Sequence, residues 1–170
     1  VKVATQNVLN FFNSPFGGEQ NQFGEDRGAD NSDEFERQTD KLIKTLYEMD
    51  ADVVCLLEVE NNGFGTYGAI KKIQDELNEE YSKEFAGDRG DPRHKDNRYA
   101  FVAVDSNGDR IINEEDTIGS DVVTTGIIYR PSKLTLEAVN VIPMPAQKAP
   151  IIVDETGAAI LDRNGELRES

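Results

Sequence analysis

The chain has 170 residues, enough for one domain with a substantial hydrophobic core. Its 33 acidic residues outnumber its 18 basic residues, and the net charge of −15 argues against binding nucleic acids or anionic membranes through a basic patch. The charge does not exclude a nuclease, because a bound divalent cation changes the local field. Acidic chains with many Asp and Asn residues in loops are also typical of secreted, calcium-bearing proteins.

The sequence contains one cysteine, Cys55, which lies inside an apolar run and cannot form an intramolecular disulfide. We interpret it as a small hydrophobe, and the redox compartment stays open. We find neither a signal peptide nor an apolar run long enough to span a membrane. Because the chain starts on strand-like residues, we expect that any targeting segment was removed or never included.

The first stretch, residues 1–12, is β-rich and mostly apolar, which predicts a strand running out into a loop. Asn7 lies near its end and needs hydrogen-bond partners. It either caps the following loop or points its amide at a phosphate or metal beside Glu58. Residues 13–33 are rich in Gly, Asn, Asp and Gln, which predicts a long polar loop that borders a site or forms a surface insertion.

A helix is predicted over residues 34–49, where apolar residues recur on one face. Asn31, followed three residues later by Glu34, resembles a capping box. Residues 50–51 then turn into the next apolar run. The order strand, loop, helix, strand predicts a βαβ-like opening of an α/β fold.

Five consecutive apolar residues, 53–57, predict a strand buried on both faces. The strand ends in acidic and amide residues, beginning with Glu58 and Glu60. A carboxylate at the end of a buried strand is costly unless a cation or hydrogen-bond donors meet it. The carboxyl ends of strands are also where open sheets bind ligands. The stretch is therefore either a platform for a divalent metal or a strand running out into a solvated acidic loop.

The rest of the chain predicts one more helix, over residues 66–80, and several strands. Residues 98–104, 122–129 and 134–142 read as strands. Residues 151–153 and 158–161 flank a turn signal and so predict a hairpin. His94, the single histidine, falls in a charged loop over residues 85–97, where we expect a solvated side chain. We expect Tyr129 and Arg130 to close a strand rather than to reach a substrate.

Residues 105–116, DSNGDRIINEED, match a 12-residue calcium-binding loop and are similar to the loops of dockerins. Calcium favours six to eight oxygen ligands, which such loops supply from positions 1, 3, 5, 7, 9 and 12. Ile111 would contribute its carbonyl, and Ile112 at position 8 would tuck inward. The six predicted ligands are Asp105, Asn107, Asp109, Ile111, Asn113 and Asp116.

Two departures predict weak calcium affinity, which suits an extracellular setting. Arg110 stands where Gly normally makes the sharp turn, and its charge repels the ion. Asp116 replaces the usual bidentate Glu. The alternative is an acidic connection between strands with a chance pattern.

Asn7 and Glu58 form a second candidate metal site. One amide and one carboxylate are too few to hold Mg²⁺ alone. Mg²⁺ usually takes one or two carboxylates together with waters and substrate phosphate. The pair therefore makes sense as part of a site that cleaves phosphate esters.

Four blocks of the chain resemble, in the right order, the amino-terminal half of the endonuclease/exonuclease/phosphatase (DNase-I-like) superfamily, and are most similar to its secreted bacterial nucleases. The blocks are TQNVLNFF, RGADNSDEFERQTDKL, ADVVCLLEVENNGFG and GSDVVTTGIIYRPSKLTLEA. Leu57 stands where the superfamily often has Gln, and Gln6 replaces an aromatic residue before Asn7. Neither change affects the metal-ligand chemistry.

The resemblance implies that residues 1–170 are the amino-terminal portion of one such domain, an α/β four-layered sandwich of two mixed sheets flanked by helices. It implies hydrolysis of phosphodiester bonds in extracellular DNA, with Glu58 as ligand of a catalytic Mg²⁺, Mn²⁺ or Ca²⁺ and Asn7 contacting metal or phosphate. It also implies a secreted bacterial protein with no membrane partner. A structural Ca²⁺ would occupy the 105–116 loop.

The family's catalytic His, its Asp-Asn pair and its final Asp-His pair lie in the carboxy-terminal half and have no match in this chain. We therefore expect the isolated chain to be inactive, and the missing half to be present as another chain, or else the chain to pair with itself. Two alternatives stay open. One is a phosphodiesterase acting on lipids or small phosphoesters, and the other is a non-catalytic, calcium-stabilised binding module.

Overall fold

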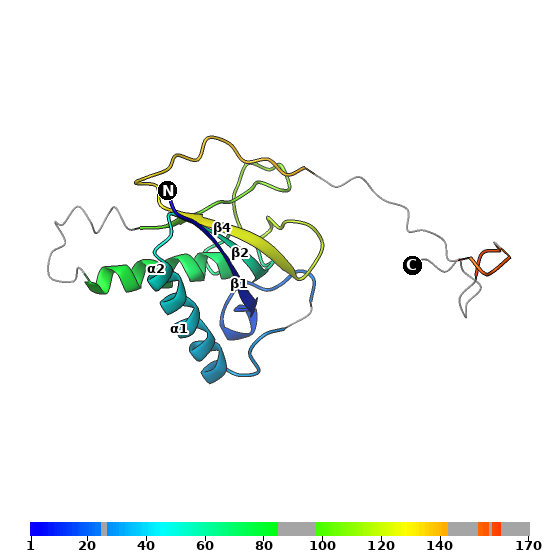
Figure 1. Cartoon of the computed structure of the whole chain (residues 1–170), viewed down its shortest axis with the longest axis horizontal. Helices are drawn as coiled ribbons and strands as arrows, with labels where there is room; N and C mark the ends of the chain where they lie inside the picture. The colour runs from blue at the N-terminus through cyan, green and yellow to red at the C-terminus, as the bar shows by residue number, and fades with distance from the viewer. Residues whose placement is uncertain (25–26, 85–97, 143–152, 157, 161–170) are drawn as a thin grey trace.

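A computed structural model of the chain describes residues 1–24, 27–84, 98–142, 153–156 and 158–160 (Figure 1). It contains one four-stranded mixed sheet with strand order β1-β2-β4-β3. β1 is parallel to β2, and β4 is antiparallel to both β2 and β3. The α/β class is thus confirmed. In chain order the elements are β1 (Val3–Phe11), η1 (Ser14–Phe16), α1 (Ser32–Met49), β2 (Val53–Glu60), α2 (Ala69–Glu84), β3 (Ala100–Phe101) and β4 (Val123–Tyr129).

The two helices cover one face of the sheet and form the hydrophobic core with it (Figure 1). The core takes alternate residues of β2, because side chains in a strand point to opposite faces in turn. These residues pack against the apolar stripes of α1 and α2. The fully buried members include Leu46 of α1, Val54 and Leu56 of β2, Ile73 and Leu77 of α2, and Ile128 of β4.

Helix α1 begins and ends as its sequence predicts, apart from two residues at its start. The Asn31 side chain accepts a hydrogen bond from the Glu34 N–H at 3.0 Å, and the Glu34 carboxylate accepts one from the Asp30 N–H at 3.0 Å. The Glu34 N–H, in the first turn of the helix, thus finds a partner. The helix ends at Met49, and the next residue, Asp50, adopts the left-handed conformation (φ 45°) and donates its N–H to the Leu46 and Tyr47 carbonyls.

Helix α2 spans residues 69–84 rather than the predicted 66–80. Its start is set by Asn62, whose side-chain oxygen accepts a hydrogen bond from the Ala69 N–H at 2.9 Å. The apolar periodicity marks the buried face correctly, but it does not locate this cap, because Asn62 lies seven residues away.

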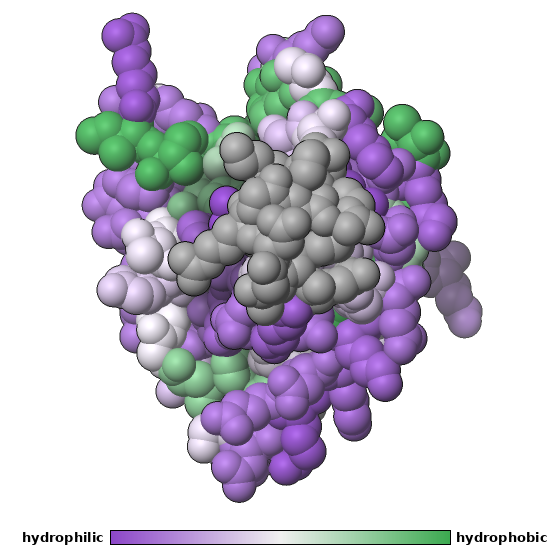
Figure 2. All heavy atoms as spheres, turned by 90° about the vertical axis from the view of Figure 1, so that its left-hand side faces the viewer, coloured by the Kyte–Doolittle hydropathy of each residue, from purple (hydrophilic) through white to green (hydrophobic). Residues whose placement is uncertain are grey.

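The described part of the chain leaves the face of the sheet that turns away from the helices largely uncovered, which corrects the expectation that β2 is buried on both faces. Val3, Leu57 and Ile127 are 66%, 39% and 40% exposed. On the face drawn in Figure 2, by contrast, hydrophilic residues predominate and the hydrophobic ones form small separate groups. We call the uncovered side the open face. It consists of three cross-strand rows: Val3, Val53 and Tyr129; Thr5, Cys55 and Ile127; and Asn7, Leu57 and Thr125.

Two predicted strands are largely absent. The strand expected over residues 98–104 is reduced to Ala100–Phe101, because the Asn78 side chain bonds both the N–H and the carbonyl of Tyr99. Residues 134–142 contain no strand. Their alternating apolar residues instead line a hollow of about 420 Å³ together with Val53, Ile127 and Tyr129 of the open face.

The predicted hairpin near the end of the chain is present in its described part. Val153 and Ala159 form an isolated antiparallel bridge, and the Asp154 carboxylate accepts the Thr156 and Ala158 N–H groups in the turn. His94 lies outside the described residues. Neither α1 nor α2 combines the length and apolar composition that a bilayer-spanning helix requires.

Candidate functional site

Asn7 and Glu58 meet near the carboxyl ends of β1 and β2, in keeping with one of the two arrangements that the sequence left open for Asn7. The Asn7 side-chain amide donates a hydrogen bond to Glu58 Oε1 at 2.7 Å, and the Asn10 N–H donates one to Glu58 Oε2 at 3.2 Å. The Leu9 N–H donates to Asn7 Oδ1 at 2.8 Å, which fixes the orientation of the amide. Each carboxylate oxygen of Glu58 thus has one protein donor and keeps acceptor capacity for a further partner.

A bulge in β2 turns Glu58 towards Asn7. Leu57 pairs with Thr125 and Val59 pairs with Thr124, so Glu58 is the extra residue, at φ 62°. In an uninterrupted strand Glu58 would point into the core with Leu56. The bulge instead lets Val59 fill the core and aims the carboxylate at β1.

A matching irregularity interrupts β1. The pairing with β2 shifts between Asn7 and Phe11, and Leu9 and Asn10 both have positive φ, at 58° and 51°. Non-glycine residues other than Asn and Asp rarely adopt this conformation, which costs about 1–2 kcal/mol each. Two strained residues, Leu9 and Glu58, and the more tolerant Asn10 therefore gather around one carboxylate.

Glu60, the second predicted acidic residue, belongs to a buried hydrogen-bond network rather than to a solvated loop. Its side chain is 2% exposed. It accepts hydrogen bonds from the Asn13 N–H at 2.7 Å, the Ser14 N–H at 3.0 Å and the Asn21 amide at 3.3 Å. These donors compensate the burial of the charge and fasten the 13–21 loop to β2.

The next two residues, Asn61 and Asn62, have the same structural role. The Asn61 amide donates to the Ile118 and Asp121 carbonyls at 3.0 and 2.9 Å. The Asn62 amide donates to Asn13 Oδ1 at 2.8 Å and to the Glu19 carbonyl at 3.0 Å. The sequence signal that we missed was a pair of amides directly after a buried strand, where loop backbone needs partners.

The 105–116 loop is curled around its own acidic and amide side chains. Each expected side-chain ligand accepts a backbone N–H: Asp105 those of Gly108 and Arg110, Asn107 that of Asp109, Asp109 that of Ile111, Asn113 that of Glu115, and Asp116 those of Ser106 and Asn113. Asp116 is fully buried. Arg110 adopts φ 70°, the left-handed conformation for which such loops use Gly. The prediction that Ile112 tucks inward is wrong, because its side chain is 46% exposed.

This loop is attached to the end of β2. The Phe64 N–H donates to the Asn113 carbonyl at 2.9 Å. Gly63, at φ 85°, approaches so closely that an added Cβ would lie 2.4 Å from the Glu114 carbonyl oxygen. The loop therefore supports the segment that follows Glu58 and Glu60.

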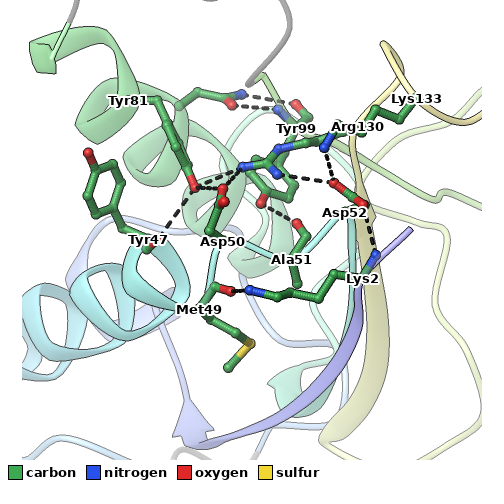
Figure 3. Close-up of polar contacts among 11 residues, drawn as sticks. Lys2, Tyr47, Met49, Asp50, Ala51, Asp52, Tyr81, Tyr99, Arg130 and Lys133 are labelled. Carbon is green, nitrogen blue, oxygen red and sulfur yellow. Dashed lines mark hydrogen bonds and ion pairs between the residues drawn. The ribbon is translucent and has the colours of Figure 1, made fainter.

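Arg130 lies at the opposite end of β2 from Glu58 and is 1% exposed (Figure 3). Its guanidinium donates to Asp52 at 3.2 Å, Asp50 at 2.5 Å and the Tyr81 hydroxyl at 2.9 Å. It also lies 4.9 Å from the centre of the Tyr99 ring, a cation–π distance. Arg130 thus closes the end of the sheet, as we expected.

These contacts shift the pKa values of both carboxyls downward. Hydrogen bonds from Lys133 and from the Lys2 N–H, with a further one from Arg130, hold the pKa of Asp52 far below its ordinary value of 3.8. Burial acts to raise the pKa of Asp50, but the hydrogen bond and charge of Arg130 outweigh it and the pKa is lowered. Burial raises the pKa of the Tyr81 and Tyr99 hydroxyls, so both stay protonated beside Arg130.

Among the residues that the structure describes, no group of three or more His, Cys, Asp or Glu side chains is placed to hold a metal ion. Glu58 and Asn7 are brought together, but residues 105–116 form a separate site. Comparisons with protein families, with characterised proteins and with solved structures found no match for this chain. The family assignment therefore stays a prediction that rests on the blocks quoted above.

We predict that Asp52→Asn makes the free energy of unfolding less sensitive to acid. In the unfolded chain Asp52 titrates near 3.8, whereas in the folded chain its pKa is lower. The stabilisation is therefore complete above about pH 5 and is lost progressively as the pH falls below it, because the unfolded chain binds the proton first. Urea unfolding at pH 7 and pH 3 measures the difference. The matched control is the exposed Asp40→Asn, and parallel pH profiles for Asp52→Asn and the wild type would contradict the prediction.

Proposed function

We propose that this chain is the amino-terminal part of a secreted, divalent-metal-dependent nuclease that hydrolyses phosphodiester bonds in extracellular DNA. The observation that carries the proposal is the Glu58 carboxylate, aimed by a bulge at Asn7 and held by two donors. Leu9 and Glu58 adopt positive φ at a cost of about 2–4 kcal/mol together, whereas Asn10 tolerates this conformation more readily. The two charge-assisted hydrogen bonds return at most about 3–6 kcal/mol, and less where water reaches them.

This balance supports a functional role for the arrangement, because it brings no clear gain in stability. Strained backbone persists mainly where a site requires it. A regular β2 would keep its ladder intact but would turn the carboxylate into the core. The pair of bulges is thus better explained by the need to present Glu58 than by the stability of the sheet.

The donor set fits a hard divalent cation. A carboxylate with spare acceptor capacity suits Mg²⁺, and Mn²⁺ or Ca²⁺ accept the same oxygen ligands. When bound, the cation would polarise a phosphoryl oxygen and stabilise its developing charge. Asn7 presents its N–H₂ to Glu58, so we assign it a positioning role, with its oxygen free to accept one further bond beside that of Leu9. The remaining ligands would be waters, substrate phosphate or groups from a second polypeptide.

We further propose that the open face packs against the complementary carboxy-terminal half, giving the four-layered sandwich that the resemblance implies. The apolar residues on this face, among them Val3, Leu57 and Ile127, support the proposal, because such an area is costly to leave in water. The covering half would also bring the catalytic His and further carboxylates to Glu58. A lone carboxylate cannot complete the site otherwise.

A second candidate function is a non-catalytic, calcium-stabilised binding module. The compact 105–116 loop favours it, because its acidic and amide side chains already turn inward to backbone N–H groups. The two candidates differ in one measurement, which is cleavage of DNA by the assembled protein. A phosphodiesterase for lipids or small phosphoesters would share the Glu58 site and would differ in substrate alone.

We expect Glu58→Ala to abolish Mg²⁺-dependent nicking of supercoiled plasmid. Asn7→Ala should slow nicking by about 10–100-fold, as is usual when a partner that orients a metal ligand is removed. The assay uses the protein with any polypeptide that co-purifies with it, identified by intact-mass analysis. Glu36→Ala, an exposed carboxylate on α1, serves as control and should leave the rate unchanged. Nicking that survives Glu58→Ala would refute the proposed role of the site.

Cys55 offers a direct measure of whether the open face is covered. It is half-buried in the central row, and no other thiol is present in the chain. We expect a thiol reagent to modify Cys55 readily in the chain alone and at least about tenfold more slowly in the assembled protein. Ile127→Lys should restore the fast reaction by preventing assembly. Equal reaction rates in the isolated and assembled protein would show that this face is not the interface.

We also propose that the 105–116 loop holds a structural Ca²⁺. The six predicted ligands lie on one loop whose side chains already point inward to backbone N–H groups, which supports the proposal. Calorimetric titration should detect Ca²⁺ binding that Asp109→Ala abolishes and Glu115→Gln, which alters no ligand, retains. Arg110→Gly should tighten binding about tenfold, because it removes a repelling charge and backbone strain. Ca²⁺ titrations that are identical for the wild type, Asp109→Ala and Arg110→Gly would exclude this site.

A further inference from the structure

A hollow of about 430 Å³ lies beside the Glu58 site, between the first half of α1 and the irregular end of β1. Its walls combine backbone and small residues with long charged side chains. The lining residues are Leu9, Asn10, Gly28, Ala29, Glu34, Arg37, Gln38 and Lys41.

Two cations project into this hollow from one turn of α1. Arg37 and Lys41 are four residues apart and therefore neighbours on the helix surface. Both are exposed, and neither forms an ion pair with another residue in the described part of the chain. The one acidic residue in the lining, Glu34, uses a carboxylate oxygen to accept the Asp30 N–H. Such a concentration of unpaired positive charge is notable in a chain of net charge −15.

The hollow and the Glu58 site share a wall. Gln38 lies between the two cations on α1 and donates its amide to the Val8 and Leu9 carbonyls at 3.1 and 2.8 Å. The next residue of β1, Asn10, donates its N–H to Glu58. The strained segment Leu9–Asn10 thus connects the carboxylate with the cationic helix turn, so that both are held in one rigid arrangement.

We propose that Arg37 and Lys41 bind a backbone phosphate of the DNA strand whose neighbouring phosphodiester lies at Glu58. The inference rests on the proposed nuclease function and assigns the side of the site along which the substrate strand continues. Guanidinium and ammonium groups are the usual partners of DNA phosphates, and such contacts position a strand without reading its sequence. A polymeric substrate presents a second phosphate beside the cleaved one, which a small phosphoester lacks.

The test is the salt dependence of DNA binding. A fluorescein-labelled DNA duplex is titrated with the protein in Ca²⁺ buffer, in a Glu58→Gln background that prevents cleavage, and anisotropy is followed at several salt concentrations. Removing the contact with this one phosphate should lower the slope of log K against log salt by about 0.9 and weaken binding at low salt. We therefore expect this change for the double variant Arg37→Gln with Lys41→Gln. Both side chains are exposed, so the fold should persist, and circular dichroism checks that it does.

The matched control is Lys44→Gln with Lys83→Gln. It removes the same charge from α1 and α2, from lysines that pair with Glu48 and Glu80 instead of lining the hollow. An unchanged slope in this control, with a reduced slope in the Arg37 and Lys41 variant, would establish the contact. The proposed contact would be overturned if the two double variants had equal salt slopes. It would also be overturned if the protein with unchanged Arg37 and Lys41 did not bind DNA.

Two further measurements distinguish failure of the proposed phosphate contact from failure of the proposed nuclease function. Inorganic phosphate that binds the wild type but not the double variant, together with DNA salt slopes that the double variant leaves unchanged, would assign the hollow to a free phosphate group and overturn the strand contact. Plasmid nicking lost on Glu58→Ala, together with unchanged salt slopes, would overturn this inference and leave the nuclease function standing. A reduced slope without nicking in any divalent metal would overturn the nuclease function and retain a phosphate contact.

Discussion

The pairing of β2 on both of its edges is the constraint on which the rest of the structure depends. β1 runs parallel to it and β4 antiparallel, so its backbone donors and acceptors are used on both sides. The strand cannot shift without breaking two ladders. Any polar group near its ends must therefore find its partners where the strand places it, and the two ends meet this demand in different ways.

At the amino-terminal end of β2, charged side chains are paired with one another inside the protein. Arg130 sits between Asp50 and Asp52 and is covered by the Tyr81 and Tyr99 rings (Figure 3). The charges of Arg130, Asp50 and Asp52 are thus paired with one another, and of the buried side-chain polar atoms described at this end only the Arg130 Nε donor lacks a hydrogen-bond partner. At the other end, Glu60 and the two Asn residues that follow it are also satisfied internally. Glu58 differs from them, because its carboxylate is half-exposed and keeps spare acceptor capacity.

Much of this fold follows from patterns in the sequence. The apolar stripe and the Asn31–Glu34 pair locate α1 almost to the residue, because both its buried face and its cap are local features. The long apolar run locates β2 for a similar reason. The meeting of Asn7 with Glu58 was predictable only in part. Parallel strands bring their carboxyl ends to the same edge of the sheet, but the sequence did not reveal that β1 and β2 are neighbours.

Other features depend on contacts that no local pattern encodes. The bulge at Glu58 is visible only through the pairing with β4, because the residues around it read as a continuous strand. β3 is short because a side chain of α2, Asn78, captures the backbone of Tyr99. The burial of β2 on a single face could not be foreseen either, since an apolar run has the same composition whether a second layer covers it or not.

The open face is apolar at one end and more polar at the other. This difference connects the proposed packing of a second layer with the proposed site at Glu58. The row of Val3, Val53 and Tyr129 is apolar, whereas the row at the other end contains Asn7 and Thr125 beside Leu57. A layer packed on the apolar rows would be held there by buried area and would end at the polar row, next to Glu58. The same contact that removes apolar surface from water would therefore deliver new groups to the carboxylate. On this view the incomplete site and the uncovered sheet have the same cause, because the packing of one layer would both cover the sheet and complete the site.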